Sequence, residues 1–229
     1  SYSDTCYHND ELKSLTHYHF DKVKEWTKLK SSVSRLVCIL FLDEFPKGSY
    51  CKNKAICFYD IARNSIGSPI PAKSLKHTIR LIQKLTSKID IIKSQVKAIM
   101  TEINSLILSI QGISYNMEAM IIAEVGNFSR FVSTDNILAY TRMSPSTYQL
   151  GQLLNGYSHM ERRGSRYLRY ALYNAAKYVC HWDESSEAYL AKKRTEGKHY
   201  IIALFYTTKK LVRTIYVMEK SSQADRIAT

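Results

Sequence analysis

The sequence is poor in the residues that interrupt helices. Of its 229 residues only 8 are Gly and 4 are Pro, and every Pro lies outside the long stretches of periodic apolar residues. Because glycine and proline mark turns, this scarcity disfavours a turn-rich β-sandwich and favours helices. The sequence therefore predicts an all-α fold.

The cysteine pattern and the short apolar runs exclude several other classes of protein. The 5 cysteines form no C-x-x-C pair and no Cys/His cluster at zinc spacing, and their odd number argues against a disulfide framework. The longest apolar runs are only a few residues, so we expect no membrane span and no signal peptide. Free thiols in a reducing compartment are the simplest interpretation.

Acidic residues are scarce relative to basic ones. The chain has 33 Lys and Arg against 20 Asp and Glu, a formal net charge of +13, and an isoelectric point near 9.4. Such an excess favours a polyanionic partner, with nucleic acid as the first candidate and an anionic membrane surface as the second. The charge could also be incidental to a helical scaffold, which predicts little salt dependence of any association with nucleic acid.

Two long amphipathic helices are predicted in the first half of the chain. Apolar residues recur at helical spacing from Asn9 to Leu42, and again after Pro71 in alternating steps of three and four that form a heptad pattern. The pattern favours a coiled coil, formed either by self-association or by an intramolecular hairpin of the two helices. Residues 43–71 hold Pro and Gly and are interpreted as a connector around a short helix, 52–63.

Beyond Asn104 the sequence predicts shorter helices separated by glycine-containing turns. We therefore expect a helical linker and coiled-coil region at 1–105, a compact DNA-binding domain at 106–220 and a flexible tail at 221–229. The last helix is predicted at 200–220, with a set of apolar residues facing inward: Ile202, Phe205, Leu211, Ile215 and Met218.

The segment from Ile110 to Gly126 resembles the second half of a helix-hairpin-helix element. In such elements a glycine turn exposes backbone N–H groups at a helix N-terminus, where they hold a phosphate without reading bases. Gly112 and Ser114 occupy that turn, which makes them candidate phosphate-contacting residues. A simple link between two core helices would have much the same sequence.

An arginine-rich segment starts another predicted helix. Ser165 is a suitable N-cap, and Arg166, Arg169 and Lys177 share an outer face with Tyr173. Basic side chains along a helix suit a sugar-phosphate track, although a charged face is often only solvated. The candidate nucleic-acid-binding residues of this segment and of the last helix are Arg162, Arg163, Gly164, Ser165, Arg166, Arg169, Lys177, Lys209, Lys210 and Arg213.

The order of several motifs resembles one known family. The stretches are S-I-Q-G-I-S, A-E-V-G-N-F-S-R-F, L-A-Y-T-R-M-S-P-S-T-Y-Q-L-G-Q and H-M-E-R-R-G-S-R-Y-L-R-Y-A-L-Y-N-A-A. In this order they resemble the C-terminal domain of transposases of the insertion sequence 110/116/902 family, and residues 15–30 resemble the segment that precedes it. The resemblance implies a DNA recombinase of bacterial or archaeal cytoplasm, associated with the nucleoid, that moves its own element with a structured guide RNA.

The same resemblance implies a mechanism and its parts. The family combines an N-terminal RuvC-like domain, whose acids hold Mg²⁺, with a coiled coil that joins protomers and a helical domain that supplies a nucleophilic serine. That serine attacks a DNA phosphate and forms a covalent link. No metal or other cofactor is expected in the present chain, because Mg²⁺ belongs to the N-terminal domain.

The sequence departs from the family pattern at the serine itself. The family serine stands before the glycine of Y-Q-S-G, and Leu150 occupies that place. Ser146 is a weak substitute. The acids of the RuvC-like domain should precede the first helix, and neither Asp4 nor Asp10 can be assigned to them. We expect a truncated, degenerate transposase that binds DNA with impaired catalysis; the alternative is a non-enzymatic nucleic-acid-binding module or a regulator of a full-length transposase.

Overall fold

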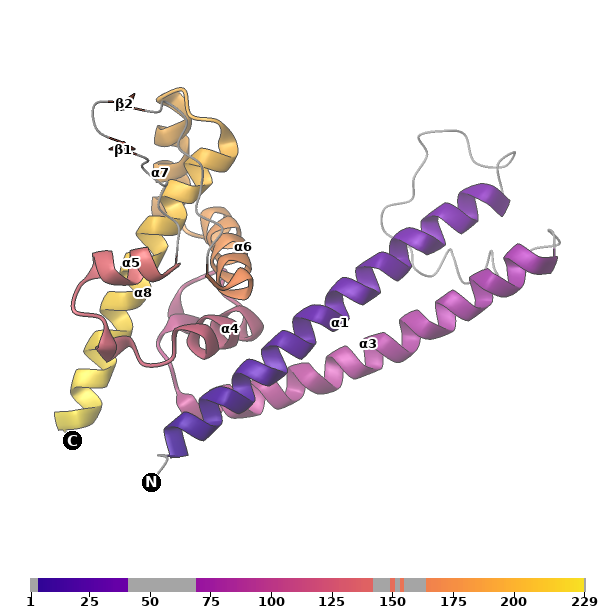
Figure 1. The fold of residues 1–229 in the computed structure, drawn as a ribbon, viewed down its shortest axis with the longest axis horizontal. Coiled ribbons are helices and arrows are strands. Elements are labelled where there is room, and N and C mark those ends of the chain that lie inside the picture. Colours follow the sequence, from indigo (N-terminus) through magenta and orange to yellow (C-terminus); the bar gives the residue numbers. More distant parts are fainter. Residues whose placement is uncertain (1–3, 41–68, 142–148, 151–152, 155–163, 229) are drawn as a thin grey trace. The chain divides into compact units, whose positions relative to one another are not determined.

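The fold is all-α, as predicted. The computed structural model describes residues 4–40, 69–141, 149–150, 153–154 and 164–228 (Figure 1). Its elements are α1 (Asp4–Leu40), α3 (Pro69–Ile103), η1 (Ile107–Ser109), α4 (Tyr115–Val125), η2 (Phe128–Arg130), α5 (Thr134–Thr141), β1 (Gln149–Leu150), β2 (Leu153–Leu154), α6 (Arg166–Trp182), α7 (Glu184–Thr195) and α8 (Tyr200–Ala228). The predicted short helix at 52–63 lies outside the described residues.

The chain divides into two compact units, and the division cuts both long helices. One unit, here called the hairpin unit, is residues 18–94. The other, here called the bundle unit, combines Ser1–His17 with Gln95–Thr229. The first turns of α1 and the last turns of α3 therefore pack with the C-terminal helices, whereas the sequence suggested a boundary near 105.

The hairpin unit consists of α1 and α3 running antiparallel beside each other (Figure 1). Val33 of α1 is buried against Leu75 and Ile79 of α3. About two turns earlier in α1, the indole Nε1 of Trp26 donates to the hydroxyl of Thr86 at 3.1 Å. The intramolecular hairpin, one of the two arrangements that the heptad pattern left open, is thus formed by α1 and α3.

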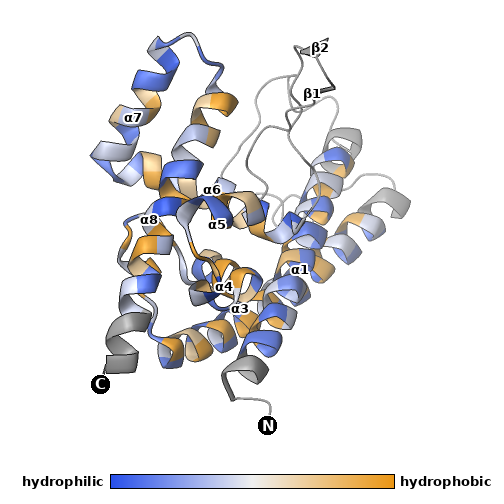
Figure 2. Cartoon of the chain, turned by 60° about the vertical axis from the view of Figure 1, so that its left-hand side comes forward, coloured by the Kyte–Doolittle hydropathy of each residue, from blue (hydrophilic) through white to orange (hydrophobic). Residues whose placement is uncertain are grey.

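The bundle unit is built around α6, which packs against α4, α7 and α8. The predicted inward face of α6 is confirmed, because Leu168, Ala171, Leu172, Ala175 and Val179 are all buried. Helix α4 is buried from Glu118 to Val125, and it is mostly orange in the hydropathy view of Figure 2. The core of this unit is therefore three helices packed around one long amphipathic helix.

Two buried carboxylates satisfy the backbone where α3 gives way to η1. Glu219 of α8 accepts hydrogen bonds from the Ser105 hydroxyl at 2.6 Å and from the Leu106 N–H at 3.1 Å, and Glu118 of α4 accepts from the Leu108 N–H at 3.1 Å. Free N–H groups at the start of a helical turn need such partners when they are shielded from water. These carboxylates tie α4 and α8 to the end of α3.

The last helix is longer than predicted, and its buried face is shifted. Ile202, expected to face inward, is 49% exposed, whereas Leu204 is fully buried. Leu211 and Ile215 are buried as expected, and Phe205 and Met218 are half-buried, so the buried face of α8 runs through Ala203, Thr207, Leu211 and Ile215 and leaves Ile202 outside it. The helix continues to Ala228 through the segment expected to be a flexible tail, where no Gly or Pro ends it.

Candidate nucleic-acid interface

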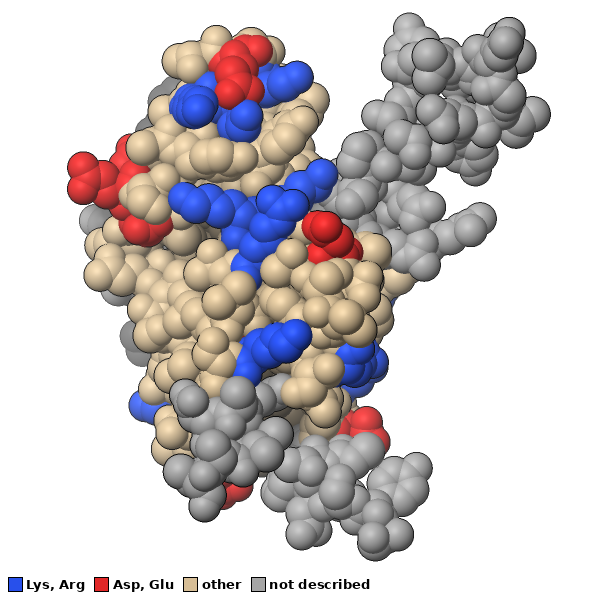
Figure 3. All heavy atoms as spheres, turned by 90° about the vertical axis from the view of Figure 1, so that its left-hand side faces the viewer, with Lys and Arg blue, Asp and Glu red and all other residues tan. Residues whose placement is uncertain are grey.

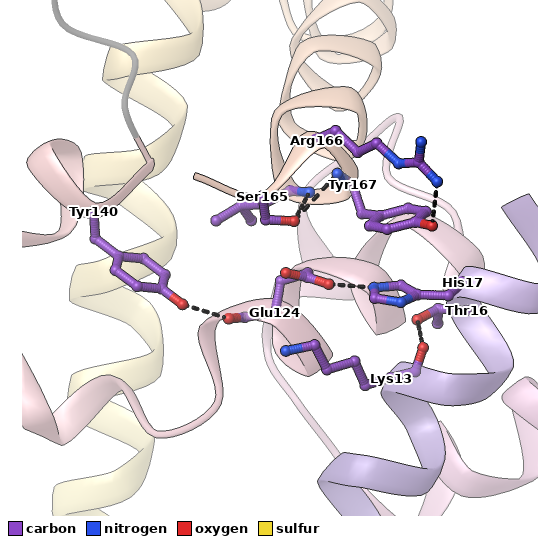
Figure 4. Close-up of polar contacts among 9 residues, drawn as sticks. Lys13, Thr16, His17, Glu124, Tyr140, Ser165, Arg166 and Tyr167 are labelled. Atoms are coloured by element: carbon purple, nitrogen blue, oxygen red, sulfur yellow. Dashed lines mark hydrogen bonds and ion pairs between the residues drawn. The ribbon is translucent and has the colours of Figure 1, made fainter. Parts of the chain in front are cut away.

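The N-terminus of α6 is capped as the sequence predicted. The Ser165 hydroxyl oxygen accepts hydrogen bonds from the N–H groups of Tyr167 and Leu168, each at 3.2 Å (Figure 4). The preceding Gly164 has φ 105°, a conformation that favours glycine. Capping by the side chain accounts for Ser165 by itself, so a nucleic-acid role for this residue stays a prediction.

Arg166 lies against its neighbour in the first turn of α6. Its Nη2 donates to the Tyr167 hydroxyl at 2.6 Å, and its guanidinium carbon lies 4.7 Å from the centroid of the Tyr167 ring. The side chain of Arg166 remains exposed. An arginine fixed on an aromatic ring at a helix N-terminus is placed in advance to meet a phosphate.

A contact between a histidine and a buried carboxylate lies directly beside this helix start. The imidazole Nε2 of His17 contacts the Glu124 carboxylate, and the His17 ring stacks on Tyr167 with centroids 3.7 Å apart (Figure 4). The Tyr140 hydroxyl donates to the Glu124 backbone carbonyl at 2.9 Å. The side chain of Glu124 is only 4% exposed and is therefore shielded from water. The imidazole of His17 replaces part of the hydration that the carboxylate loses. The pair connects the beginning of α1, the end of α4 and the beginning of α6.

The sequence analysis missed this pair. His17 and Glu124 are 107 residues apart, and no local pattern connects them. The one available signal was a charged residue inside the apolar run Met120–Val125, since a carboxylate in such a run is rarely buried without a partner.

The glycine turn before α4 is in place, and its glycine is packed against α6. Gly112 has φ 93°, and a Cβ added to it would lie 2.9 Å from the backbone carbonyl carbon of Tyr178. Close approach of two backbones explains this glycine without a phosphate. The arm before the turn is the three-residue η1, and Ser114 precedes α4 with an exposed side chain. Phosphate contact by Gly112 or Ser114 therefore stays a prediction.

The outer face of α6 is only partly exposed to solvent. Lys177 is exposed, as expected, but Arg169 and Tyr173 are half-buried. Tyr173 contacts Phe205 of α8, with ring centroids 5.7 Å apart. The predicted residues Arg162 and Arg163 lie outside the described part of the chain.

The three basic residues predicted on the last helix share one face of α8. Lys209 is half-exposed, and Lys210 and Arg213 are exposed. Arg213 lies 3.6 Å from the exposed carboxylate of Asp135 on α5, and Lys210 donates to the Ser185 hydroxyl at 3.4 Å. Contacts this long between exposed groups hold the side chains loosely. A band of Lys and Arg side chains crosses the middle of the face drawn in Figure 3.

The position of the expected nucleophile lies in a very short strand pair. Leu150 ends β1 and is the register partner of Leu153 in β2, while Gln149 is opposite Leu154. Ser146 lies outside the described residues. A leucine has no hydroxyl, so position 150 cannot supply an oxygen nucleophile whatever its surroundings.

A metal-binding cluster and a membrane-spanning helix are both absent from the part of the chain that the structure describes. No group of three or more His, Cys, Asp or Glu residues there is arranged to hold a metal ion. None of the helices among these residues is long and apolar enough to cross a membrane.

Comparison with known proteins identifies the domain that carries these features. Residues 104–191 match the model of the Transposase IS116/IS110/IS902 family. This part of the chain is therefore similar to the transposase domain of the IS116/IS110/IS902 family. This domain covers η1, α4, η2, α5, α6 and most of α7, so it includes Glu124, the Leu150 strand and the capped start of α6.

A curated protein from Streptomyces coelicolor supports the assignment of the transposase domain. The chain is 23% identical over 147 residues to "Insertion element IS110 uncharacterized 43.6 kDa protein" of that organism. The match covers 60% of this chain and 36% of the relative. The chain thus spans little more than a third of the length of that relative.

Proposed function

We propose that this chain is the DNA-binding part of an insertion-sequence transposase and that it works without the serine chemistry of its family. The observation that supports the proposal is the row of basic side chains on α8, next to a capped α6 helix that belongs to the transposase domain. Arg213 follows Lys209 by four residues and Lys210 by three, so both lysines lie beside the arginine on one side of the helix. Such a row suits successive phosphates of one strand.

Impaired catalysis is the second part of the proposal. In the family pattern a serine hydroxyl would attack the DNA phosphate, and Leu150 stands in its place. Ser146 is four residues away and does not match that place. We therefore expect binding of DNA, and of a guide RNA where one is present, without formation of a covalent protein–DNA link.

Removal of the three basic side chains from α8 tests whether this helix binds DNA. In K209A/K210A/R213A the affinity for a labelled duplex, measured by fluorescence anisotropy, should fall at least tenfold at low salt. The matched control is R80A/K84A/K88A, which removes the same number of exposed charges from α3. Equal losses in the two variants would mean that affinity follows net charge alone, and the proposed interface would be wrong.

A second candidate function is a regulator that pairs with a full-length transposase. It is favoured by exposed apolar side chains on α3 of the hairpin unit, where Ile91 is 59% exposed and Leu81 is 37% exposed. A helical hairpin with apolar residues on its outside can join a second copy. Light scattering after size exclusion tests this: a dimer that I91K converts to a monomer supports it, and a monomeric wild-type chain at 100 µM or so counts against it.

A further inference from the structure

Two tyrosines and three lysines form a continuous surface on α7 and α8 that the sequence analysis did not identify. The Lys193 ammonium on α7 lies 5.7 Å from the ring centroid of Tyr189 and 5.3 Å from that of Tyr206 on α8. Lys209 lies 5.7 Å from the Tyr206 centroid, and Lys210 lies 5.4 Å from the Tyr189 centroid. We call these residues the Tyr–Lys surface. Since one ammonium is near both rings, a single short strand can reach both.

Helical geometry keeps most acidic side chains away from this surface. On α7, Glu184 and Glu187 are five and two residues before Tyr189, which places them on other sides of the helix. On α8, Glu219 is buried in the core of the bundle unit. Two carboxylates are exceptions. Glu196 forms an ion pair with Lys193 at 2.8 Å, and the pKa of Asp183 is lowered by its hydrogen bonds with Ser186 and Ser185 and also by the nearby charge of Lys210. Lys209 and Lys210 still add positive charge beside the two rings.

The two rings are accessible to different degrees. Tyr206 is 37% exposed, and Tyr189 is half-buried. Tyrosines in a core would be better covered, and each of these two is followed three and four residues later by lysines on the same side of its helix. Ammonium groups near aromatic rings bring a charge that binds phosphate next to a face on which a base can stack.

We propose that the Tyr–Lys surface binds single-stranded nucleic acid, with bases stacked on Tyr206 and Tyr189 and phosphates held by Lys209 and Lys210. A duplex would use the charges but not the rings, because its bases are already stacked on each other. This inference rests on the proposed function, because Lys209 and Lys210 belong to both surfaces. It adds the form of nucleic acid, single-stranded, that these residues and the two tyrosines bind. Helix α8 follows the matched transposase domain, which ends at residue 191, so the surface extends beyond that domain.

The test compares a labelled dT oligonucleotide, an rU oligonucleotide and a duplex, each titrated with the full chain at fixed salt. Y206A and Y189A should each lose roughly five- to hundredfold in affinity for the oligonucleotides, the range expected for one stacked base, and much less for the duplex. Y206F should retain the affinity, because stacking needs the ring and not the hydroxyl. The dT and rU arms show which sugar is preferred.

The matched control is Tyr18 on α1, an exposed tyrosine with the Lys22 ammonium 5.4 Å from its ring centroid but without the surrounding basic cluster. Y18A should bind the oligonucleotides as the wild type does. Unchanged oligonucleotide affinity in Y206A and Y189A would overturn the inference, and so would equal losses for oligonucleotide and duplex. The inference would also be overturned if Y206A and Y189A lost affinity only for anionic phosphatidylserine vesicles and kept their affinity for the oligonucleotides. A chain that binds oligonucleotides through the tyrosines but no duplex would refute the proposed duplex interface and leave this inference standing.

Discussion

The imidazole of His17 in α1 contacts the buried carboxylate of Glu124 near the end of α4 (Figure 4). The same imidazole stacks on the ring of Tyr167 in α6. One contact thereby joins three helices of the bundle unit beside the capped start of α6. The same contact holds the Tyr167 ring, to whose hydroxyl the preceding residue, Arg166, donates a hydrogen bond.

Removal of the imidazole should destabilise the bundle unit. H17A leaves the Glu124 carboxylate buried without its partner, and we expect the free energy of unfolding in urea to fall by about 2 kcal/mol, less than for a fully buried pair because His17 is 29% exposed. H77A, at an exposed histidine of α3, is the control. Identical urea midpoints for the two variants would show that the pair adds nothing to stability.

Glu118 should make stability depend on pH. The pKa of Glu118 is raised from 4.5 to about 7, mainly by burial and also by the nearby Glu219, while hydrogen bonds from Ser105 and from the Leu108 N–H partly oppose the shift. The folded chain therefore binds more protons than the unfolded chain between these two pKa values, so this contribution is complete below about pH 4.5 and is lost as the pH rises to about 7.

The expected loss is on the order of 2–3 kcal/mol, and it is measured as the difference between wild type and E118Q in urea unfolding at several pH values. Subtracting the variant removes the effects of all other titrating groups. The stability of the wild type relative to E118Q should fall from pH 5 to pH 8. A difference that stays constant, or that grows with pH, would contradict the assignment.

Gly112 and Gly197 allow the cost of a steric clash to be separated from the cost of a strained backbone conformation. Both have positive φ, 93° and 79°, but an added Cβ meets the α6 backbone only at Gly112 and nothing within 4 Å at Gly197. G197A should cost about 1 kcal/mol from conformation alone, and G112A at least about 2 kcal/mol more because helices α4 and α6 must separate. Thermal unfolding of both variants checks this, and equal costs would refute the close packing.

The proposal of impaired catalysis predicts that the chain forms no covalent link to DNA. The chain, incubated with Mg²⁺ and DNA from an element end, should give no protein–DNA adduct that survives denaturing electrophoresis, because leucine cannot form a phosphoester. An adduct would contradict the proposal of impaired catalysis. If S146A then abolished that adduct, Ser146 would be the nucleophile.

The regular helices could be predicted from the sequence because their signals are local. The three-and-four spacing from Leu75 to Ile103 and the capped amphipathic pattern of α6 both depend on residues within a few turns. The His17–Glu124 pair could not be predicted, because it depends on how separate helices meet. The face of α8 was predicted only in part for a related reason: Leu211 and Ile215 are buried as expected, but the apolar Ile202 is exposed while Ala203 and Thr207 are buried. Tyr189 and Tyr206 became visible as one surface only after α7 and α8 were placed side by side.

The most direct test of the account is the salt dependence of duplex binding. Each phosphate neutralised by a basic side chain adds about 0.9 to the negative slope of log affinity against log salt concentration. The wild-type slope should exceed that of K209A/K210A/R213A by between about 2 and 3, while R80A/K84A/K88A keeps the wild-type slope. A slope near zero for the wild type, or the same slope for all three proteins, would contradict a nucleic-acid interface on α8.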